Sequence, residues 1–478
     1  MPRNRFRFSA RSALAVPAAL CLLLAGCALT PPEPPAPVVV PGAFKEAGPW
    51  QRATVQTPVP DAWWTLFQDP VLDDLQNRLV IGNQNLKSVV AQVASARAAL
   101  EASRSAGLPT LSAGLSATRT GSPDSSSGFA TSTTRGPSNN LSLSASANWE
   151  IDLWGRLTQA TTGAQAQWQA SVDDLAATRL SAQATLAQTY FSLRSAEAQS
   201  ALLERSVQAY QRSLDLTQLR YDAGVVARSD VLQAQTQLKS AQAQMLESAT
   251  QRAQLEHAIA VLLGLPPSEL TLARSDKLPS SPAVPELLPA TLLERRPDIA
   301  AAQRRVAVAY AQIGVTDAAF YPSLNLSASA GFRNSMLANL VSAPNLFWSL
   351  GSSLAQAIFD SGQRKLASAQ ARNSAEQATS TYRQVVLTAL QEVEDNLVLA
   401  NQLQREAQLQ DEALQAARRN QEIVLDQYRA GTVSYLNVVI AQTAALNSES
   451  SLLSVRNRQL AAVNQLLKNI AGRWEVAG

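Results

Sequence analysis

Four short segments of the chain alternate between apolar and polar residues with a period of two. Residues 111–117, 141–149 and 324–332 carry apolar side chains at every second position, with serine, asparagine or glycine between them, and residues 346–354 repeat the pattern more loosely. This alternation indicates β-strands with one apolar face. Their length of about ten residues suits a tilted strand that crosses a bilayer. We therefore predict four strands, arranged as two pairs that are each joined by a loop.

A soluble antiparallel sheet with one solvated face would show the same alternation. Little of the remaining chain is suited to cover a sheet face, which favours a bilayer. Trp149, Phe332 and Trp348 lie near strand ends on the apolar side, as in an interfacial aromatic belt, although a soluble core would use them too. In lipid every backbone hydrogen-bonding group must be paired, so four strands must close into a barrel with other copies. Because a closed barrel needs about eight strands, we predict three copies and twelve strands.

Helical periodicity dominates the rest of the chain. Residues 155–220 and 362–427 place apolar residues every three or four positions without a proline, which predicts two helices of about 66 residues, or about 100 Å each. A free-standing coiled coil is the alternative, and it leaves the strands unexplained. Shorter helices are predicted at residues 71–106, 229–263, 289–319 and 434–471. The apolar stripes of the long helices comprise Leu203, Val207, Tyr210, Leu214 and Tyr221 in the first and Val386, Leu390, Val393, Leu397 and Ala400 in the second.

The two halves of the chain are related in sequence. Residues 220–236 and 427–443 share eight identities in seventeen aligned positions, at an offset of 207. The same offset aligns Gly155 with Gly362, so the long helical segments have equal length. A repeated unit of roughly 200 residues is too long for a short-repeat solenoid. It predicts a protomer made of two similar modules.

The first 26 residues have the features of a cleaved leader. Four arginines precede an apolar run, and small residues close that run just before Cys27. This pattern predicts a lipoprotein signal peptide, with Cys27 as the first mature residue, carrying diacylglycerol and N-palmitate. An ordinary signal peptide with an incidental cysteine is the alternative. Since Cys21 would be removed with the leader, we expect no internal disulfide. Residues 30–41 are rich in proline and predict a polyproline II tether of roughly 35 Å.

Composition and charge exclude several function classes. The chain has 40 Lys and Arg against 37 Asp and Glu, and without the four arginines of the leader the balance is 36 against 37. That balance is not the basic footprint of a nucleic-acid-binding protein. His257 is the only histidine, for which we expect a structural role, and no nucleotide-binding Gly-x-x-x-x-Gly-Lys-Ser/Thr loop occurs. We therefore predict neither an enzyme nor a metal site nor a cofactor beyond the lipid on Cys27.

Several motifs resemble those of a known family. They are WWTLFQDP at residues 63–70, LLERRPDI at 292–299, WEIDLWG at 149–155 with its counterpart IFDSG at 358–362, and a Tyr-x-x-Gly turn used twice. They are similar to motifs of the TolC-like outer-membrane efflux proteins, most closely the lipoprotein branch that serves resistance-nodulation-division (RND) pumps. The resemblance covers essentially the whole mature chain.

This resemblance implies an α+β membrane protein with internal duplication. It would be a homotrimer in the Gram-negative outer membrane, anchored by lipid, with a twelve-stranded β-barrel continued by a long periplasmic α-helical barrel. The implied function is the passive exit duct of a tripartite efflux system that exports small molecules such as drugs. The implied partners are a periplasmic adaptor and an inner-membrane RND-type transporter. The alternatives are an exit duct for type I protein secretion and a structural lipoprotein spacer without a pore.

Under this resemblance the two Tyr-x-x-Gly turns lie at the far periplasmic end, where an adaptor docks and the duct closes. The family commonly carries an aspartate ring after the second turn, but no acid is found at Val433, Ser434, Asn437 or Ile440. Two modes of closure are therefore considered: a ring formed by Asp230, and closure through apolar contacts and hydrogen bonds. The docking residues would be Asp222, Ala223, Gly224, Val225, Arg429, Ala430, Gly431 and Thr432. The gate candidates are Asp230, Tyr221, Tyr428, Arg429, Val433 and Asn437.

Three arginines near the turns and a belt around the helical barrel are also assigned from the sequence. For Arg220, Arg228 and Arg429 a solvated surface position is favoured over a latch between helices. A mixed belt around the helical barrel would draw on residues before Pro70, on 264–289 and on the chain after Gly472. The predicted organisation is a signal peptide (1–26), a lipidated N-terminus and tether (27–60), a first repeat (61–270), an equatorial linker (271–290), a second repeat (291–471) and a C-terminal tail (472–478).

Overall fold

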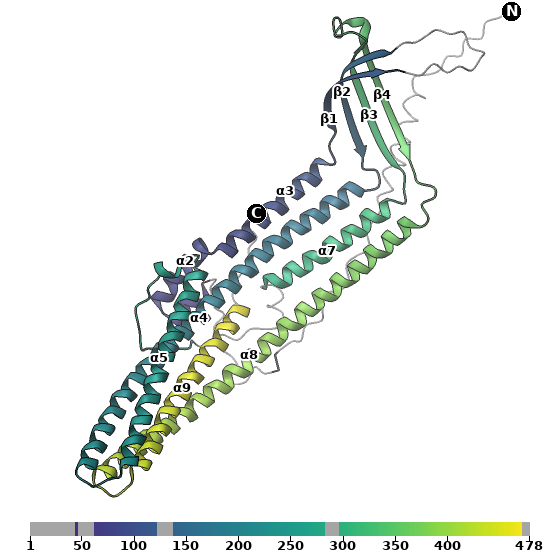
Figure 1. The fold of residues 1–478 in the computed structure, drawn as a ribbon. Helices are drawn as coiled ribbons and strands as arrows, with labels where there is room; N and C mark the ends of the chain where they lie inside the picture. The colour runs from purple at the N-terminus through teal and green to yellow at the C-terminus, as the bar shows by residue number, and fades with distance from the viewer. Residues whose placement is uncertain (1–43, 46–61, 122–136, 283–295, 471–478) are drawn as a thin grey trace, which may run out of the picture. The chain divides into compact units, whose positions relative to one another are not determined.

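The computed structural model of the protein describes residues 44–45, 62–121, 137–282 and 296–470. The predicted leader, Cys27, the proline-rich tether and the C-terminal tail lie outside the described residues, as do the end of the predicted linker and the start of the LLERRPDI motif. Two compact units make up the chain (Figure 1). The sheet unit contains Val93–Ser171 and Ala302–Tyr382, and the helical unit contains Pro37–Gln92, Val172–Ala301 and Arg383–Gly478.

The sheet unit holds the four predicted strands. They form one antiparallel sheet in the order β1-β2-β3-β4. This order leaves β1 and β4 as the edges of the sheet within one protomer. The strands are β1 (Thr110–Thr120), β2 (Ser138–Ile151), β3 (Ser323–Asn334) and β4 (Leu346–Ala355).

The two predicted long helices are confirmed. Helix α4 (Arg156–Asp222) and helix α8 (Gln363–Arg429) each contain 67 residues, and each follows a glycine with positive φ, +77° at Gly155 and +85° at Gly362. The predicted stripes are buried at Leu203 and Val393, whereas Tyr221 at the end of α4 is 37 % exposed. The later short helices are α5 (Arg228–Leu262), α7 (Pro297–Ala318) and α9 (Tyr435–Ile470).

The first short helix differs from its prediction as one continuous segment. The chain breaks at Asn83 between α2 (Pro70–Gly82) and α3 (Gln84–Ser105). A Cβ on Gly82 would lie 2.0 Å from the Leu263 carbonyl oxygen, so the backbones meet more closely than any side chain permits. The Asn83 Nδ2 donates to the Leu262 carbonyl at 2.7 Å, and the Leu86 N–H donates to Asn83 Oδ1 at 2.9 Å. A contact with the end of α5 therefore stabilises the break.

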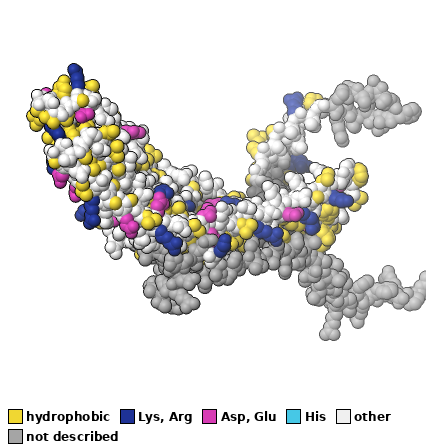
Figure 2. All heavy atoms as spheres, turned by 90° about the horizontal axis from the view of Figure 1, so that it is seen from below, with side chains coloured by type: hydrophobic (Ala, Val, Ile, Leu, Met, Phe, Trp, Pro, Cys, Tyr) yellow, Lys and Arg dark blue, Asp and Glu magenta, His cyan; other side chains and the backbone are white. Residues whose placement is uncertain are grey.

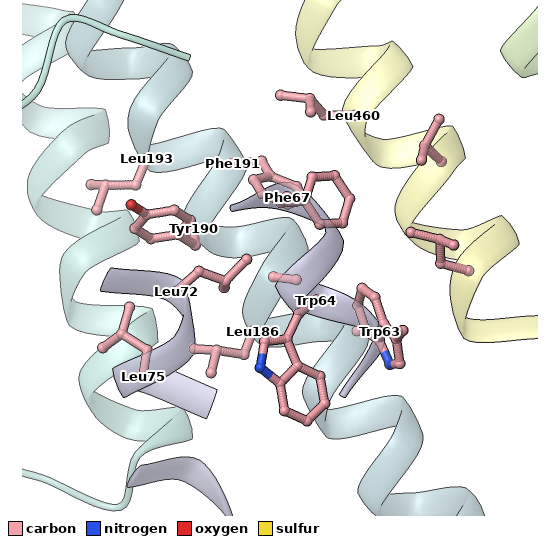
Figure 3. Packing of buried hydrophobic residues seen from close by; sticks show 14 of the residues in the cluster. Trp63, Trp64, Phe67, Leu72, Leu75, Leu186, Tyr190, Phe191, Leu193 and Leu460 are labelled. Atoms are coloured by element: carbon pink, nitrogen blue, oxygen red, sulfur yellow. The ribbon is translucent and has the colours of Figure 1, made fainter. Parts of the chain in front are cut away.

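The main hydrophobic core lies in the helical unit (Figure 3). The 3-10 helix η2 (Trp63–Phe67) inserts Trp63 and Phe67, which are 0 % and 2 % exposed, against Phe191 of α4. The Phe67 and Phe191 ring centroids are 4.7 Å apart. Burial of each such side chain stabilises the fold by about 1.5–3 kcal/mol. The WWTLFQDP motif thus attaches the start of the described chain to the long helix.

Within the described residues, no helix has both the length and the apolar character required to cross a bilayer.

Candidate functional site

The register of the sheet places apolar and polar residues in separate rows over most of its length. Leu115 lies opposite Leu143, which lies opposite Phe332, which lies opposite Leu346. On the other face Ser112, Ser146, Ser329 and Ser349 form the corresponding polar row. Serine hydroxyls of this row hydrogen-bond across strands at 2.8 Å in both outer pairs. The predicted faces are therefore confirmed in every strand pair.

The apolar face is open in one protomer. Leu111, Trp348 and Leu350 are 75–79 % exposed. Nothing within the described part of the sheet unit covers this face, and the outer edges of β1 and β4 have no strand partner among the described residues. A surface of this kind is stable in hydrocarbon and unstable in water.

Polar and aromatic residues fix the end of the sheet from which the helices leave. The Trp154 indole donates to the Pro322 carbonyl at 2.7 Å and stacks on Tyr321 at a centroid distance of 4.8 Å. Asp152 accepts hydrogen bonds from the first backbone N–H groups of α4. These residues border a cavity of about 230 Å³. The WEIDLWG motif is thus a rigid joint between strand and helix.

The counterpart motif IFDSG makes a similar joint before α8. The Asp360 carboxylate accepts from the Gly362 N–H at 3.0 Å and from Arg364 Nε at 2.6 Å. The hydrogen bond from Arg364 holds the pKa of Asp360 below its usual value. Ile358 and Phe359, just before it, are 86 % and 87 % exposed.

The two predicted glycine turns close the helical hairpins α4-α5 and α8-α9. Gly224 and Gly431 have φ of +73° and +80°, the left-handed region that the Tyr-x-x-Gly motif requires. In each turn the residue after the glycine donates back to the long helix, Val225 to the Arg220 carbonyl at 2.8 Å and Thr432 to the Gln427 carbonyl at 3.0 Å. This is the bonding of a Schellman helix end. The duplication therefore extends to individual hydrogen bonds.

Arg220 and Tyr428 join the two hairpins. The Arg220 guanidinium lies 4.6 Å above the centroid of the Tyr428 ring and donates to the Tyr428 carbonyl oxygen. The Tyr428 hydroxyl lies 3.1 Å from Thr217 Oγ1, and its ring packs 5.5 Å from that of Tyr435. For Arg220 the surface position favoured from sequence is wrong, because this side chain latches one repeat to the other. Burial, together with the charges of Tyr428, Tyr210 and Asp230, raises the pKa of Tyr435.

The candidate gate residues occupy different environments. Tyr221, Arg429 and Asn437 are exposed, and Asp230 and Val433 are half-buried. Tyr428 is only 2 % exposed, so its side chain works inside the protomer and cannot line a duct. Arg429 pairs with Asp426 of the same helix at 3.1 Å. The proposed docking residues Asp222, Ala223, Gly224, Val225, Ala430, Gly431 and Thr432 are all exposed at the turns.

A buried ionic network is a feature that sequence reasoning missed. Glu197 accepts from Arg194 at 2.6 Å and from Arg252 at 3.1 Å, and the side chains of Arg194 and Glu197 are only 5 % and 3 % exposed. Arg194 also donates to the Ala273 carbonyl, and Arg252 to the Leu272 carbonyl. Burial alone would lower the pKa of Arg194, but the hydrogen bonds that Arg194 donates to Tyr190 and Glu197 outweigh it and raise that pKa. The network ties the chain that follows α5 to α4, which carries Arg194 and Glu197, and to α5, which carries Arg252.

The described end of the LLERRPDI motif makes a second charged cluster. Arg296 pairs with Asp298 at 2.6 Å and with Glu392 at 2.8 Å, and it donates to Asn469 at 3.2 Å. Burial alone would raise the pKa of Asp298, but the hydrogen bond from Arg296 outweighs it and lowers that pKa. The cluster joins the start of α7 to α8 and α9, which explains why this motif combines arginine with aspartate.

Chemistry-bearing clusters are otherwise scarce. No group of three His, Cys, Asp or Glu side chains in the described residues could hold a metal ion. His257 is exposed on α5. On the described surface seen in Figure 2, acidic and basic side chains are scattered among hydrophobic ones, without a large patch of one sign.

Comparison with known proteins gives concordant matches. The model of a family described as outer membrane efflux protein matches residues 75–265 and 288–472. The solvent efflux pump outer membrane protein SrpC of Pseudomonas putida is 29 % identical over 95 % of this chain and 97 % of its own length. The pyoverdine export outer membrane protein OpmQ of Pseudomonas aeruginosa is 29 % identical over 95 % of this chain and 96 % of its own. The solved structure of the outer-membrane channel OprN is 27 % identical, with a TM-score of 0.86 over 93 % of this chain and 99 % of its own.

Proposed function

This chain belongs to the outer membrane efflux protein family, as its motifs predicted, and we propose that it forms the exit duct of a tripartite efflux system. It is an outer-membrane efflux protein that extends into the periplasm. The single observation that carries the duct proposal is the sheet, with one apolar face, one serine-rich face and two unpaired edges.

The unpaired edges support a closed assembly of several copies. A backbone N–H or C=O left unpaired in hydrocarbon costs several kcal/mol, so β1 of one protomer must pair with β4 of the next. Three copies bring twelve strands, which is enough to enclose a water-filled lumen lined by the polar face. The apolar face then meets lipid. We infer a homotrimer on these grounds.

The remaining parts of the proposal concern the anchor and the partners. Cys27 is the proposed lipidation site, carrying diacylglycerol and N-palmitate, and it is supported by the leader that precedes it. The hairpin ends around Gly224 and Gly431 are the proposed docking surface for a periplasmic adaptor. An RND-type transporter would supply the energy, since the sequence holds no nucleotide-binding loop. The protein itself would act as a passive conduit and not as an enzyme.

The exported compounds are proposed to be small molecules. Relatives are named for solvent efflux and for pyoverdine export. A lumen lined mainly by serine and asparagine offers hydrogen bonds without a fitted pocket, which suits solutes of varied shape.

Reconstitution tests the proposal directly. The purified full-length protein, in planar bilayers, is expected to give stepwise ion conductance and to run as a trimer by native mass spectrometry. A deletion strain that carries this gene with matched adaptor and pump genes should regain resistance to pump substrates. A stable, non-conducting monomer in detergent would contradict the duct and leave a structural spacer as the function.

A further inference from the structure

The polar face of the sheet is almost free of charge. Serine, threonine, asparagine and glycine fill most of its positions, and in the four described strands only Glu150 and Arg333 on this face are charged. The two lie at opposite ends of the sheet. Glu150 is next to the end of β2 from which α4 leaves, and Arg333 is next to the last residue of β3, at the hairpin end.

The two charges differ in their partners. Glu150 accepts two hydrogen bonds from Arg156, at 2.8 Å and 3.0 Å, which neutralise it. Within the described residues no carboxylate pairs with Arg333, which is exposed. Over the described strands the polar face therefore has one uncompensated charge, and it is positive.

An aromatic residue holds Arg333 in place. Phe347 is directly opposite Gly331 in the register, and the Arg333 guanidinium carbon lies 4.9 Å from the centroid of the Phe347 ring. Gly331 itself carries no side chain, and a Cβ there would lie 2.3 Å from the Leu143 carbonyl oxygen of β2, so β3 approaches β2 closely at this row. Phe347 is the one aromatic residue on the polar face of the described strands, since Trp149, Phe332 and Trp348 are on the apolar face. A guanidinium stacked on a ring is a preorganised site for a flat anion.

We propose that Arg333 and Phe347, repeated in each protomer, form an anion-binding ring just inside the outer mouth of the duct, and that its ligands are anionic solutes with a planar aromatic part. This inference rests on the proposed duct. Twelve strands spaced by about 4.8 Å and tilted by about 40° enclose a lumen of roughly 12 Å radius at the backbone. An inward-pointing arginine then brings its charge to within about one Debye length, ~8 Å, of the axis. Three such charges act on every ion that crosses this level, so anions are enriched and cations are repelled.

Ion selectivity and block in planar bilayers test the ring. In a KCl gradient at low salt, Arg333→Glu is expected to lower the chloride-to-potassium permeability ratio of the trimer about two- to fivefold, with Arg333→Gln in between. ATP is the probe for aromatic anions. It should block the wild-type current from one side of the bilayer only, more weakly as salt rises, and Phe347→Leu should weaken that block about three- to tenfold.

Arg119→Gln is the matched control. Arg119 is near the same end of the sheet, but its register opposite Asn139 places it on the other face, so selectivity and block should stay at wild-type values. Equal selectivity and equal ATP block in wild type and Arg333→Gln trimers that conduct would overturn the ring and leave the duct intact. Absence of conductance in the wild type would instead contradict the duct itself. If Arg333→Glu does not assemble, Arg333→Gln and the salt dependence of the wild-type block decide the question.

Discussion

At the scale of single residues, Arg220 links the two halves of a duplicated chain. Its stacking on Tyr428 contributes about 0.5–2 kcal/mol, and its hydrogen bond to the Tyr428 carbonyl adds about 1.5–3 kcal/mol. The corresponding position in the second repeat is Gln427, which cannot repeat the contact. This contact is therefore not duplicated in the second repeat.

Arg220→Gln is expected to loosen the hairpin ends. The variant loses the stacked charge, so the α8-α9 turn should move more freely and the mean conductance of the trimer in planar bilayers should rise. Arg228→Gln, at an exposed position on α5, is the control and should conduct as the wild type does. Equal conductance in the two variants would show that Arg220 does not help to close the duct at the hairpin ends.

Asp298 gives the protein a defined dependence on acid. Its pKa in the fold is lowered by Arg296, against an unfolded value of about 3.9. A lowered pKa stabilises the fold above the unfolded pKa, and this contribution is lost as pH falls through the folded value. Asp298→Asn should therefore melt earlier than the wild type at pH 7, and the difference should shrink below about pH 4. Circular dichroism melts over a pH series measure this, with the exposed Asp276→Asn as the control.

At the scale of elements, the alternation of the strands gives a matched pair of substitutions. Ala147 faces the apolar side of β2 and Ser146 the polar side, one residue apart. Ala147→Arg places a charge in lipid at a cost of about 2–4 kcal/mol per protomer, whereas Ser146→Arg places it in water. The first variant should yield little heat-resistant trimer on gels, and the second should assemble normally. Equal assembly of both would contradict the assignment of the faces.

The ionic network at Glu197 gives a second prediction at this scale. Glu197→Ala leaves Arg194 and Arg252 buried without their shared partner, which is expected to cost about 3–5 kcal/mol. The chain around Ala273, which these arginines hold, should become sensitive to limited proteolysis. Glu406→Ala breaks only an exposed pair with Arg458 and should cost at most about 1 kcal/mol. Similar melting of the two variants would show that the network is not stabilising.

Local patterns explain which elements could be predicted from the sequence. The strands and the long helices follow from periods of 2 and 3.6 residues, which neighbouring positions alone determine. The positive φ at Gly224 and Gly431 follows from glycine itself. The Gly82-Asn83 dipeptide is a turn signal in the first short helix. It does not by itself predict a break, because the hydrogen bond that stabilises the break is made with the end of α5, which is distant in sequence.

Contacts between distant segments explain what was missed. Arg220 meets Tyr428 across 208 positions, and Arg194 meets Ala273 across 79. The composition of either segment does not reveal its partner. A lone arginine on a polar helix is usually solvated, so the sequence favoured the wrong environment for Arg220. Tyr428 was a gate candidate through the family resemblance, and its burial against Thr217, 211 positions away, is a contact of the same long-range kind.

At the scale of the whole molecule, the predicted anchor can be separated from the fold. Cys27→Ser should abolish incorporation of radiolabelled palmitate into the mature protein. Cys21→Ser, inside the predicted leader, should leave labelling unchanged, since that cysteine is removed with the leader. Labelling of the Cys27→Ser variant would show that the lipid is attached elsewhere, and absence of label in the wild type would contradict the lipoprotein leader.

The bare borders of β1 and β4 also constrain biogenesis. Insertion of a single chain into the bilayer is energetically unfavourable, because the backbone amides at the free edges of β1 and β4 would have no hydrogen-bond partners in hydrocarbon. Insertion must therefore wait until three newly exported chains have met. Its rate should rise more steeply than linearly with the amount of protein synthesised, and sparse expression should leave a pool of uninserted subunits exposed to periplasmic proteases.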